Sequence, residues 1–196
     1  MYLPFDDLID TFIENKIGIA ENFLPVTLAS QLKNNLMDLH AKQLMQTAGT
    51  GNESAAAIDV KFRSDRIYWL DRQHNDIIEN RFFDLMDAFV IHLNHTCFTG
   101  IQGYEFHYAL YETGSFYKKH LDQFRNNQSR AYSMIMYLNA DWKVEDGGEL
   151  CIYHEHTKHL ITPLMGKSVF FKSSELEHEV LETHKPRLSI TGWLKT

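Results

Sequence analysis

Two histidines and one aspartate, His120, Asp122 and His178, are residues of the types that bind transition-metal ions. His120 and Asp122 stand two positions apart, and side chains two apart on a β-strand point to the same side. We therefore expect their imidazole and carboxylate to reach one point in space, and the fold to bring His178 to it. Two imidazoles and one carboxylate on one face of an ion, with open positions opposite, are typical of non-heme Fe(II) oxygenases.

Arg187 lies nine positions after His178 and is a candidate for the same site. Its guanidinium is a rigid fork of donors that matches a carboxylate. Beside a metal centre of this type, it indicates an oxygenase whose co-substrate carries a carboxylate, such as 2-oxoglutarate.

The segment 187–194 is expected to be a β-strand with two different faces. One face would carry a polar set, Arg187, Ser189, Thr191 and Trp193. The other would carry an apolar set, Leu188, Ile190 and Leu194. If both faces are covered, the polar set lines a cavity, because a buried guanidinium without a partner is costly. If the polar face meets solvent, Arg187 is simply hydrated, which is the usual situation for arginine.

The composition is that of an ordinary globular protein. The 196 residues favour one domain over 1–196, which can bury roughly 70% of the surface of the unfolded chain. Hydrophobic residues make up 44% of the chain and charged residues 23%. The formal net charge of −7 disfavours contact with phosphate backbones, so no nucleic-acid partner is expected.

The cysteines and the N-terminal segment give no sign of an oxidising or membrane environment. Cys97 and Cys151 are expected to be small buried hydrophobic side chains rather than a disulfide. The stretch 1–14 is acidic and lacks the basic and apolar regions of a signal peptide. No apolar run reaches the roughly 18 residues that a membrane helix needs. We therefore expect no membrane partner and, by default, a cytoplasmic location; the oligomeric state is left open.

The first part of the chain, 1–100, is expected to be mostly helical support. Apolar side chains recur at helical spacing in 6–15, in a helix that follows Thr27 as its N-cap, and in 78–93. The segment 46–57, which contains Thr-Ala-Gly-Thr-Gly-Asn-Glu-Ser, has the composition of a loop. It is either a plain connection or a lid beside an active site, as long loops in compact domains often are.

From residue 101 onward the polarity alternates with a period of two, which indicates strands. After a strand entry at 62–70, strands are expected over 104–111, 131–139, 149–153, 168–171 and 187–194. Several short strands at this spacing favour a sandwich or barrel. The fold class is therefore α+β and mainly β, with the catalytic core in 101–196.

Between Tyr111 and Leu194 these residues form an ordered series of motifs. The series is Tyr111-x-x-Gly114, His120-x-Asp122, Tyr137-Leu138-Asn139-x-Asp141-Trp142, Gly147-Gly148-Glu149-Leu150, Pro163 with Gly166, Val169-Phe170-Phe171, His178-Glu179-Val180, and Arg187 with Trp193. It resembles the core of the 2-oxoglutarate- and Fe(II)-dependent dioxygenases, specifically the prolyl-4-hydroxylase-like branch. Phe23-Leu24-Pro25 and Arg63-Ser64-Asp65-Arg66-Ile67-x-Trp69 extend the resemblance to the oxygen-sensing prolyl hydroxylases and their bacterial relatives.

The resemblance implies a double-stranded β-helix, or jelly roll, with supporting N-terminal helices. It implies that His120, Asp122 and His178 hold Fe(II) and are the catalytic centre. It places Arg187 and Tyr137 on the distal carboxylate of 2-oxoglutarate, and Tyr111 and Thr191 in the pocket for this co-substrate. It also makes 46–57 a substrate-covering loop and Arg130 a contact at the rim of the substrate site.

The chemistry implied by the resemblance uses O2 and 2-oxoglutarate and releases succinate and CO2, with ascorbate as an optional further cofactor. The expected substrate is an amino-acid side chain, above all a prolyl residue in a protein or peptide partner. The same chemistry on a free amino acid or small metabolite is an alternative, and so is a non-catalytic jelly roll that binds a metal or ligand. The acidic charge of the chain argues against a nucleic-acid demethylase.

Two features depart from or refine the pattern. Ser64 stands where the nearest relatives are expected to have glycine, and the lid region has no signature of a particular target. Asp122 keeps the carboxylate ligand, which argues against the related halogenases, in which chloride takes that position.

The remaining histidines and acids allow two interpretations each. The group His154, His156 and His159 has a zinc-like spacing, but a solvated hairpin loop is favoured. His107 lies on the strand face of Tyr111 and is either near the pocket or, as we expect, a core histidine with satisfied hydrogen bonds. The acids Glu175, Glu177 and Glu179 either orient the imidazole of His178 or form a solvated strand edge.

Overall fold

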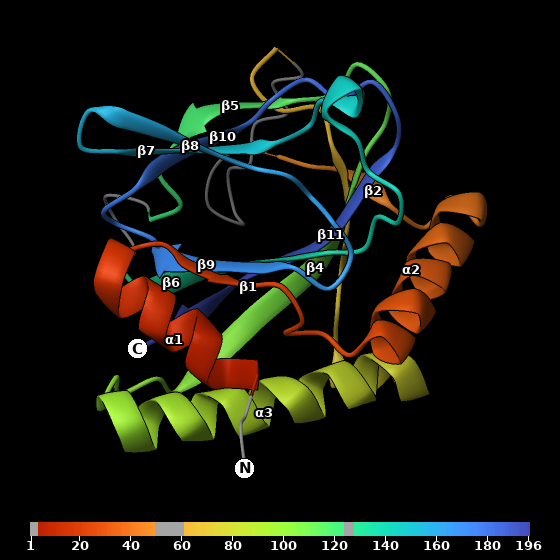
Figure 1. Cartoon of the computed structure of the whole chain (residues 1–196). Coiled ribbons are helices and arrows are strands. Elements are labelled where there is room, and N and C mark those ends of the chain that lie inside the picture. Colours follow the sequence, from red (N-terminus) through yellow and green to blue (C-terminus); the bar gives the residue numbers. More distant parts are fainter. Residues whose placement is uncertain (1–3, 50–60, 124–127) are drawn as a thin grey trace.

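The computed structural model describes residues 4–49, 61–123 and 128–196. This part of the chain forms three α-helices and two antiparallel β-sheets, which confirms the predicted class, α+β and mainly β. The two sheets face each other, and helices α1 and α3 lie on the far side of the larger sheet (Figure 1). The metal ligands predicted from the sequence come from the smaller sheet and the segment that follows one of its strands.

The helices are α1 (Pro4–Asn15), α2 (Val26–Ala41) and α3 (Ile77–Cys97), with single 3-10 turns at Arg72–His74 and Val144–Asp146. Their predicted apolar faces pack with the outer face of the larger sheet into one hydrophobic core, except for Ile13 on α1, which is exposed. None of the helices in the described segments is long and apolar enough to cross a membrane.

The predicted N-cap of α2 at Thr27 is wrong, because the helix starts earlier. Pro25 is the N-cap, with an extended backbone at φ −55° and ψ 134°, and its carbonyl accepts the first helical hydrogen bond from the amide of Ala29 at 2.9 Å. The proline ring holds φ near this value at no further cost, so it competes successfully with a hydroxyl cap two positions later.

The larger sheet has seven strands within the described residues. In spatial order they are β1 (Gly18–Ala20), β9 (Ser168–Lys172), β6 (Arg130–Tyr137), β11 (Arg187–Lys195), β4 (Gly103–Tyr111), β3 (Arg66–Trp69) and β2 (Gln46–Thr47). The alternation along these strands sends one set of side chains to the helices and the other into the space between the sheets.

The smaller sheet has four strands in the described part of the chain. In spatial order they are β5 (Tyr117–His120), β10 (Glu177–Val180), β7 (Leu150–His154) and β8 (Thr157–Ile161). A second hydrophobic core lies between the two sheets and is built from their inward-facing side chains. This arrangement is the predicted jelly roll, and it covers both faces of β11.

The predicted loop over 46–57 is partly wrong. Gln46–Thr47 forms the short strand β2, which pairs with β3 at the edge of the larger sheet, and Ala48 is buried. The backbone of Gln46 and Thr47 therefore finds partners at an open edge, which loop composition alone does not reveal. The rest of the proposed lid, 50–57, lies outside the described residues.

Candidate metal centre

His120, Asp122 and His178 converge, as predicted. His120 is the last residue of β5, and it is the direct cross-strand partner of His178 on β10. One ligand atom of each side chain, two imidazole nitrogens and a carboxylate oxygen, lies within 4.8 Å of the other two. In the segments the structure describes, this is the one cluster of three or more such side chains that could hold a metal ion.

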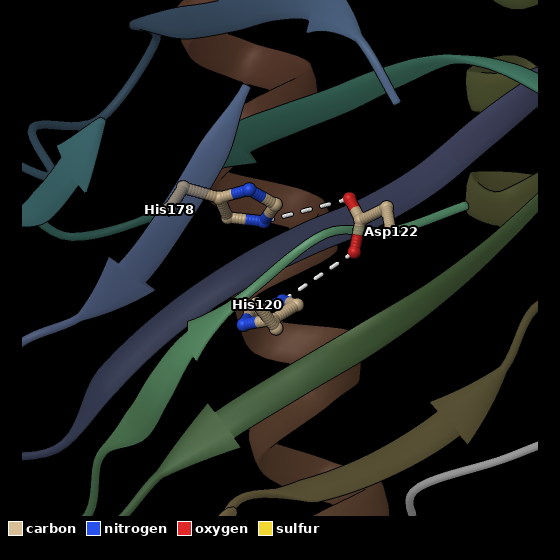
Figure 2. Close-up of side chains that lie close together, drawn as sticks. All are labelled: His120, Asp122 and His178. Carbon is tan, nitrogen blue, oxygen red and sulfur yellow. Dashed lines mark ion pairs between the residues drawn. The ribbon is translucent and has the colours of Figure 1, made fainter. Parts of the chain in front are cut away.

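The reason given for the convergence of His120 and Asp122 needs a correction. β5 ends at His120, so the two residues are not on one strand, and Asp122 stands in the segment that leaves it. The Asp122 carboxylate lies between the two rings, with Oδ1 3.4 Å from Nε2 of His120 and Oδ2 3.5 Å from Nε2 of His178 (Figure 2). The turn away from the strand, rather than its alternation, brings the carboxylate to the imidazoles.

Backbone carbonyls orient both imidazoles. Nδ1 of His120 donates to the carbonyl of Lys118 at 2.6 Å, and Nδ1 of His178 donates to the carbonyl of Leu176 at 3.1 Å. A carbonyl can only accept, so in a neutral ring the proton sits on Nδ1 and Nε2 keeps its lone pair. Both lone pairs therefore face Asp122 and are available to a metal ion.

The acids around His178 do not orient it, so the solvated-edge interpretation of this group holds. Glu175 pairs with Lys172 at 2.7 Å and Glu177 with Lys119 at 2.6 Å, while Glu179 accepts a hydrogen bond from the hydroxyl of Tyr153. Alternation explains this arrangement, because the neighbours of an inward-facing His178 on β10 must point outward.

The electrostatics of the triad favour a cation. Burial by itself would raise the pKa of Asp122, but the two imidazoles and a hydrogen bond from Ser133 reverse this effect and hold the pKa well below its usual range. Burial lowers the pKa of His178 to about 4, against the opposing effect of the Asp122 carboxylate. The site thus presents one carboxylate and a neutral imidazole, the protonation states in which these groups bind metals.

Ser133 on β6 is a metal-site residue that no pattern in the sequence indicated. Its hydroxyl donates to Oδ2 of Asp122 at 2.6 Å, and the hydroxyl of Ser173 lies 2.9 Å from that of Ser133. Both serines are fully buried. Ser133 therefore fixes the orientation of the carboxylate from the opposite sheet.

We expect the substitution Ser133→Ala to lower the affinity for Fe(II) about tenfold, because outer partners of metal ligands typically have effects of this size. An anaerobic Fe(II) titration of the purified protein measures it. Ser168→Ala is the matched control, since Ser168 is buried in the same sheet and its hydroxyl has no partner among the described residues. Equal Fe(II) affinity in the Ser133 variant and the wild type would show that Asp122 does not depend on this bond.

Arg187 lies at the base of the pocket and is 1% exposed, so the solvent-facing alternative for its strand is wrong. Its Nε donates to the carbonyl of Gly148 at 2.8 Å, and its guanidinium carbon lies 5.0 Å from the ring centre of Tyr111 and 5.1 Å from that of Tyr137. Its Nη2 has no hydrogen-bond partner among the described residues.

The hydroxyl of Tyr137 is also buried without a partner in the described part of the chain. Burial raises the pKa of Tyr137 to about 12, against the opposing effect of Arg187, so the hydroxyl keeps its proton and can donate. Two unused donors, one of them charged, are costly to bury. A carboxylate would satisfy both, so the residues present fit the carboxylate co-substrate that the sequence predicts.

One pocket connects these groups. Its wall includes the metal triad, Arg187, and the predicted co-substrate residues Tyr111 and Thr191. Tyr137 contributes its ring against the Arg187 guanidinium. A pocket with metal ligands in its wall and a guanidinium at its base can hold a metal-bound acid and keep bulk water away from it.

Two arginines near the pocket are held by buried or half-buried acids. Arg63 makes a two-pronged ion pair with Asp65, at 2.6 and 2.8 Å, and its guanidinium lies 4.6 Å from the ring centre of Tyr117. Arg130, predicted at the substrate rim, pairs with Glu105 at 2.7 Å. Arg63 and Asp65 both belong to the motif noted in the sequence, whereas the contact of Arg63 with Tyr117 on β5 was not predicted.

The other predicted histidine cluster is a hairpin. His154 ends β7 and His159 lies on β8, with His156 in the turn between them, and the turn is exposed. The favoured interpretation, a solvated hairpin loop, therefore agrees with the structure.

Comparisons with known proteins agree with the geometry. The sequence profile described as "2OG-Fe(II) oxygenase superfamily" matches residues 106–195. A prolyl-4-hydroxylase from Pseudomonas putida is 31% identical, with a TM-score of 0.86, over 97% of this chain and 98% of that one.

Two more distant structures share the fold. A prolyl hydroxylase from Trichoplax adhaerens, in complex with a peptide fragment of the hypoxia inducible factor oxygen degradation domain, is 22% identical, with a TM-score of 0.86 over 97% of this chain and 88% of that one. A viral collagen prolyl hydroxylase from Paramecium Bursaria Chlorella virus-1, in a 2OG complex, is 18% identical, with a TM-score of 0.63 over 93% of this chain and 97% of that one.

Proposed function

We propose that this chain, which belongs to the 2OG-Fe(II) oxygenase superfamily, hydroxylates a prolyl residue in a protein or peptide. The chain is a 2OG-dependent dioxygenase with a double-stranded β-helix, Fe(II) is held by the triad His120, Asp122 and His178, and 2-oxoglutarate is the co-substrate. The observation that carries the finer proposal is the 31% identity to a prolyl-4-hydroxylase along almost the whole of both chains.

When bound, Fe(II), 2-oxoglutarate and O2 supply an oxidative decarboxylation that yields succinate and CO2 and transfers one oxygen atom to the substrate. The protein's own contribution is to bind and to orient. In our proposal, Arg187 and Tyr137 donate to the distal carboxylate of 2-oxoglutarate, and Tyr111 and Thr191 shape the pocket around it. With three protein ligands, a bound metal ion would keep positions open for the co-substrate and O2.

The test is to incubate the protein with Fe(II), 2-oxoglutarate, O2 and ascorbate, together with a panel of proline-containing peptides. We expect succinate release that depends on a peptide, and the addition of one oxygen atom to a prolyl residue of that peptide, as seen by mass spectrometry. Free L-proline and other free amino acids are assayed in parallel. Oxygen addition to a free amino acid and to none of the peptides would refute the protein or peptide substrate.

A further inference from the structure

His107 and Trp193 lie together in the pocket wall. His107 on β4 is cross-strand to Thr191 on β11 and to Trp69 on β3. Its ring centre is 5.5 Å from that of Trp193, in a stacked arrangement, and 5.0 Å from that of Trp69. His107 and Trp193 line the pocket, whereas Trp69, 42% exposed, lies next to them at the surface.

The polar atoms of this pair are buried and unused. Neither ring nitrogen of His107 has a hydrogen-bond partner among the described residues, and the indole N–H of Trp193 has none there either. His107 is 1% exposed and Trp193 6%. The prediction that His107 is a satisfied core histidine is therefore wrong, because its strand face looks into the pocket rather than into the helical core. Three polar atoms buried in this way are costly unless a bound molecule satisfies them.

The end of the co-substrate that Arg187 would hold lies too far along the sheet to satisfy these atoms. In the register of β11 and β4, Arg187 lies opposite Tyr111 and Thr191 lies opposite His107. His107 is therefore four residues along the sheet from the position of Arg187. At about 3.3 Å per residue the backbones are about 13 Å apart, so the carboxylate held by Arg187 would be the end of the co-substrate that is far from His107. Ser133, which holds Asp122, is paired with Trp193, so the metal ligands lie close to the His107 end of the pocket. The free donors and acceptor therefore face the place where a substrate must approach the metal.

The pair offers hydrogen bonds without charge. Burial, together with the nearby charges of Arg63 and Arg130, holds the pKa of His107 well below its usual value, so the ring is neutral with one donor and one acceptor. Trp193 adds one donor. The charges of Arg63 and Arg130 are already paired with Asp65 and Glu105. The opposing charge at His107 is that of the Asp122 carboxylate, which would be taken up by the metal ion, so an ammonium or carboxylate beside His107 would lose its hydration without a free opposite charge.

We propose that His107 and Trp193 are specificity-determining residues that hydrogen-bond an uncharged peptide amide next to the target side chain. The ring of His107 accepts from an amide N–H or donates to a carbonyl, and the indole of Trp193 donates to a carbonyl. The inference rests on the proposed function and narrows it, because these residues select a residue within a peptide over a free amino acid, whose backbone groups are charged.

The experiment measures KM separately for a proline-containing peptide that the wild type hydroxylates and for 2-oxoglutarate. We expect His107→Leu to raise the peptide KM about tenfold, the usual effect of losing a buried hydrogen bond, and the 2-oxoglutarate KM less than twofold. His107→Gln, which keeps a donor and an acceptor, should recover most of the loss. Trp193→Phe, which keeps an aromatic ring but removes the N–H, should raise the peptide KM severalfold.

Thermal unfolding shows whether each variant is folded, and His92→Leu is the matched control, because His92 is a half-buried histidine on α3 that pairs with Asp6 away from the pocket. If wild type hydroxylates the peptide and both pocket variants leave the peptide KM within twofold, the inference fails while the proposed function stands. If wild type hydroxylates free L-proline and no peptide, the proposed function fails, and the inference fails with it. The second result is seen in the wild type alone, so the two failures are distinguishable.

Discussion

The substitution Asp122→Ala is expected to lower the rate of succinate formation by on the order of a thousandfold, together with a loss of Fe(II) affinity. Asp122 supplies the one carboxylate of the triad, and it lies 3.4 Å and 3.5 Å from the two imidazole nitrogens. Without this carboxylate, a bound cation would have two neutral ligands in a buried pocket, and nothing among these ligands would compensate the charge of the cation. The alanine at position 122 also makes no contact with the hydroxyl of Ser133.

Succinate release at saturating 2-oxoglutarate and an anaerobic Fe(II) titration measure the two effects. His120→Ala should give losses of the same order, because it removes another ligand from the same ion. Glu177→Ala is the control, since Glu177 is an acid adjacent to His178 whose side chain points outward to Lys119. Undiminished turnover in the Asp122 or His120 variant would contradict the assignment of the triad.

The second large effect is expected at Arg187, where replacement by alanine should raise the KM for 2-oxoglutarate about a hundredfold, or ~2.8 kcal/mol. The reason is that Nη2 of Arg187 is the charged donor without a partner at the base of the pocket, and a charged hydrogen bond to a carboxylate is strong. Fe(II) affinity should change little, because the hydrogen bonds of Arg187 go to Gly148 and Ser189 and not to the triad.

Initial rates at varied 2-oxoglutarate, with an Fe(II) titration of the same variant, separate the two quantities. Arg187→Lys keeps the charge but not the planar fork, so it should show an intermediate KM. Arg66→Ala is the control, because Arg66 is a half-exposed arginine on β3 whose partner is Glu112. A co-substrate KM that is unchanged in Arg187→Ala would place the distal carboxylate elsewhere.

The sequence predicted the metal ligands well because their chemistry restricts the residue types. The sequence has two histidines and an aspartate, followed by an arginine, in an order that suits short strands. These residue types alone indicate a metal site and a co-substrate that carries a carboxylate. The alternation of β11 likewise identified the face that carries Arg187. It did not decide whether that face meets water, because burial depends on the second sheet, whose position is not a local property of the strand.

Contacts between segments that are distant in the chain could not be predicted from the sequence. Ser133 donates to Asp122 from the opposite sheet, and nothing in the residues around Ser133 distinguishes it from other strand serines. The acids beside His178 left open whether they orient its imidazole, and backbone carbonyls, which no sequence pattern marks, orient both rings. His107 was misjudged for a related reason, since a histidine on an inward face looks the same whether its neighbours satisfy it or not.

The pairing of His120 with His178 has a mechanical consequence. β5 is the outermost strand of the smaller sheet: β10 pairs with one side of it, and the other side has a single bridge to the segment before β3, between Tyr117 and Arg63. A cation bound by all three side chains crosslinks this short edge to its neighbour and to the segment beyond it. Loss of the metal would therefore remove a crosslink as well as a reactant, and we expect local unfolding of the smaller sheet to begin at β5.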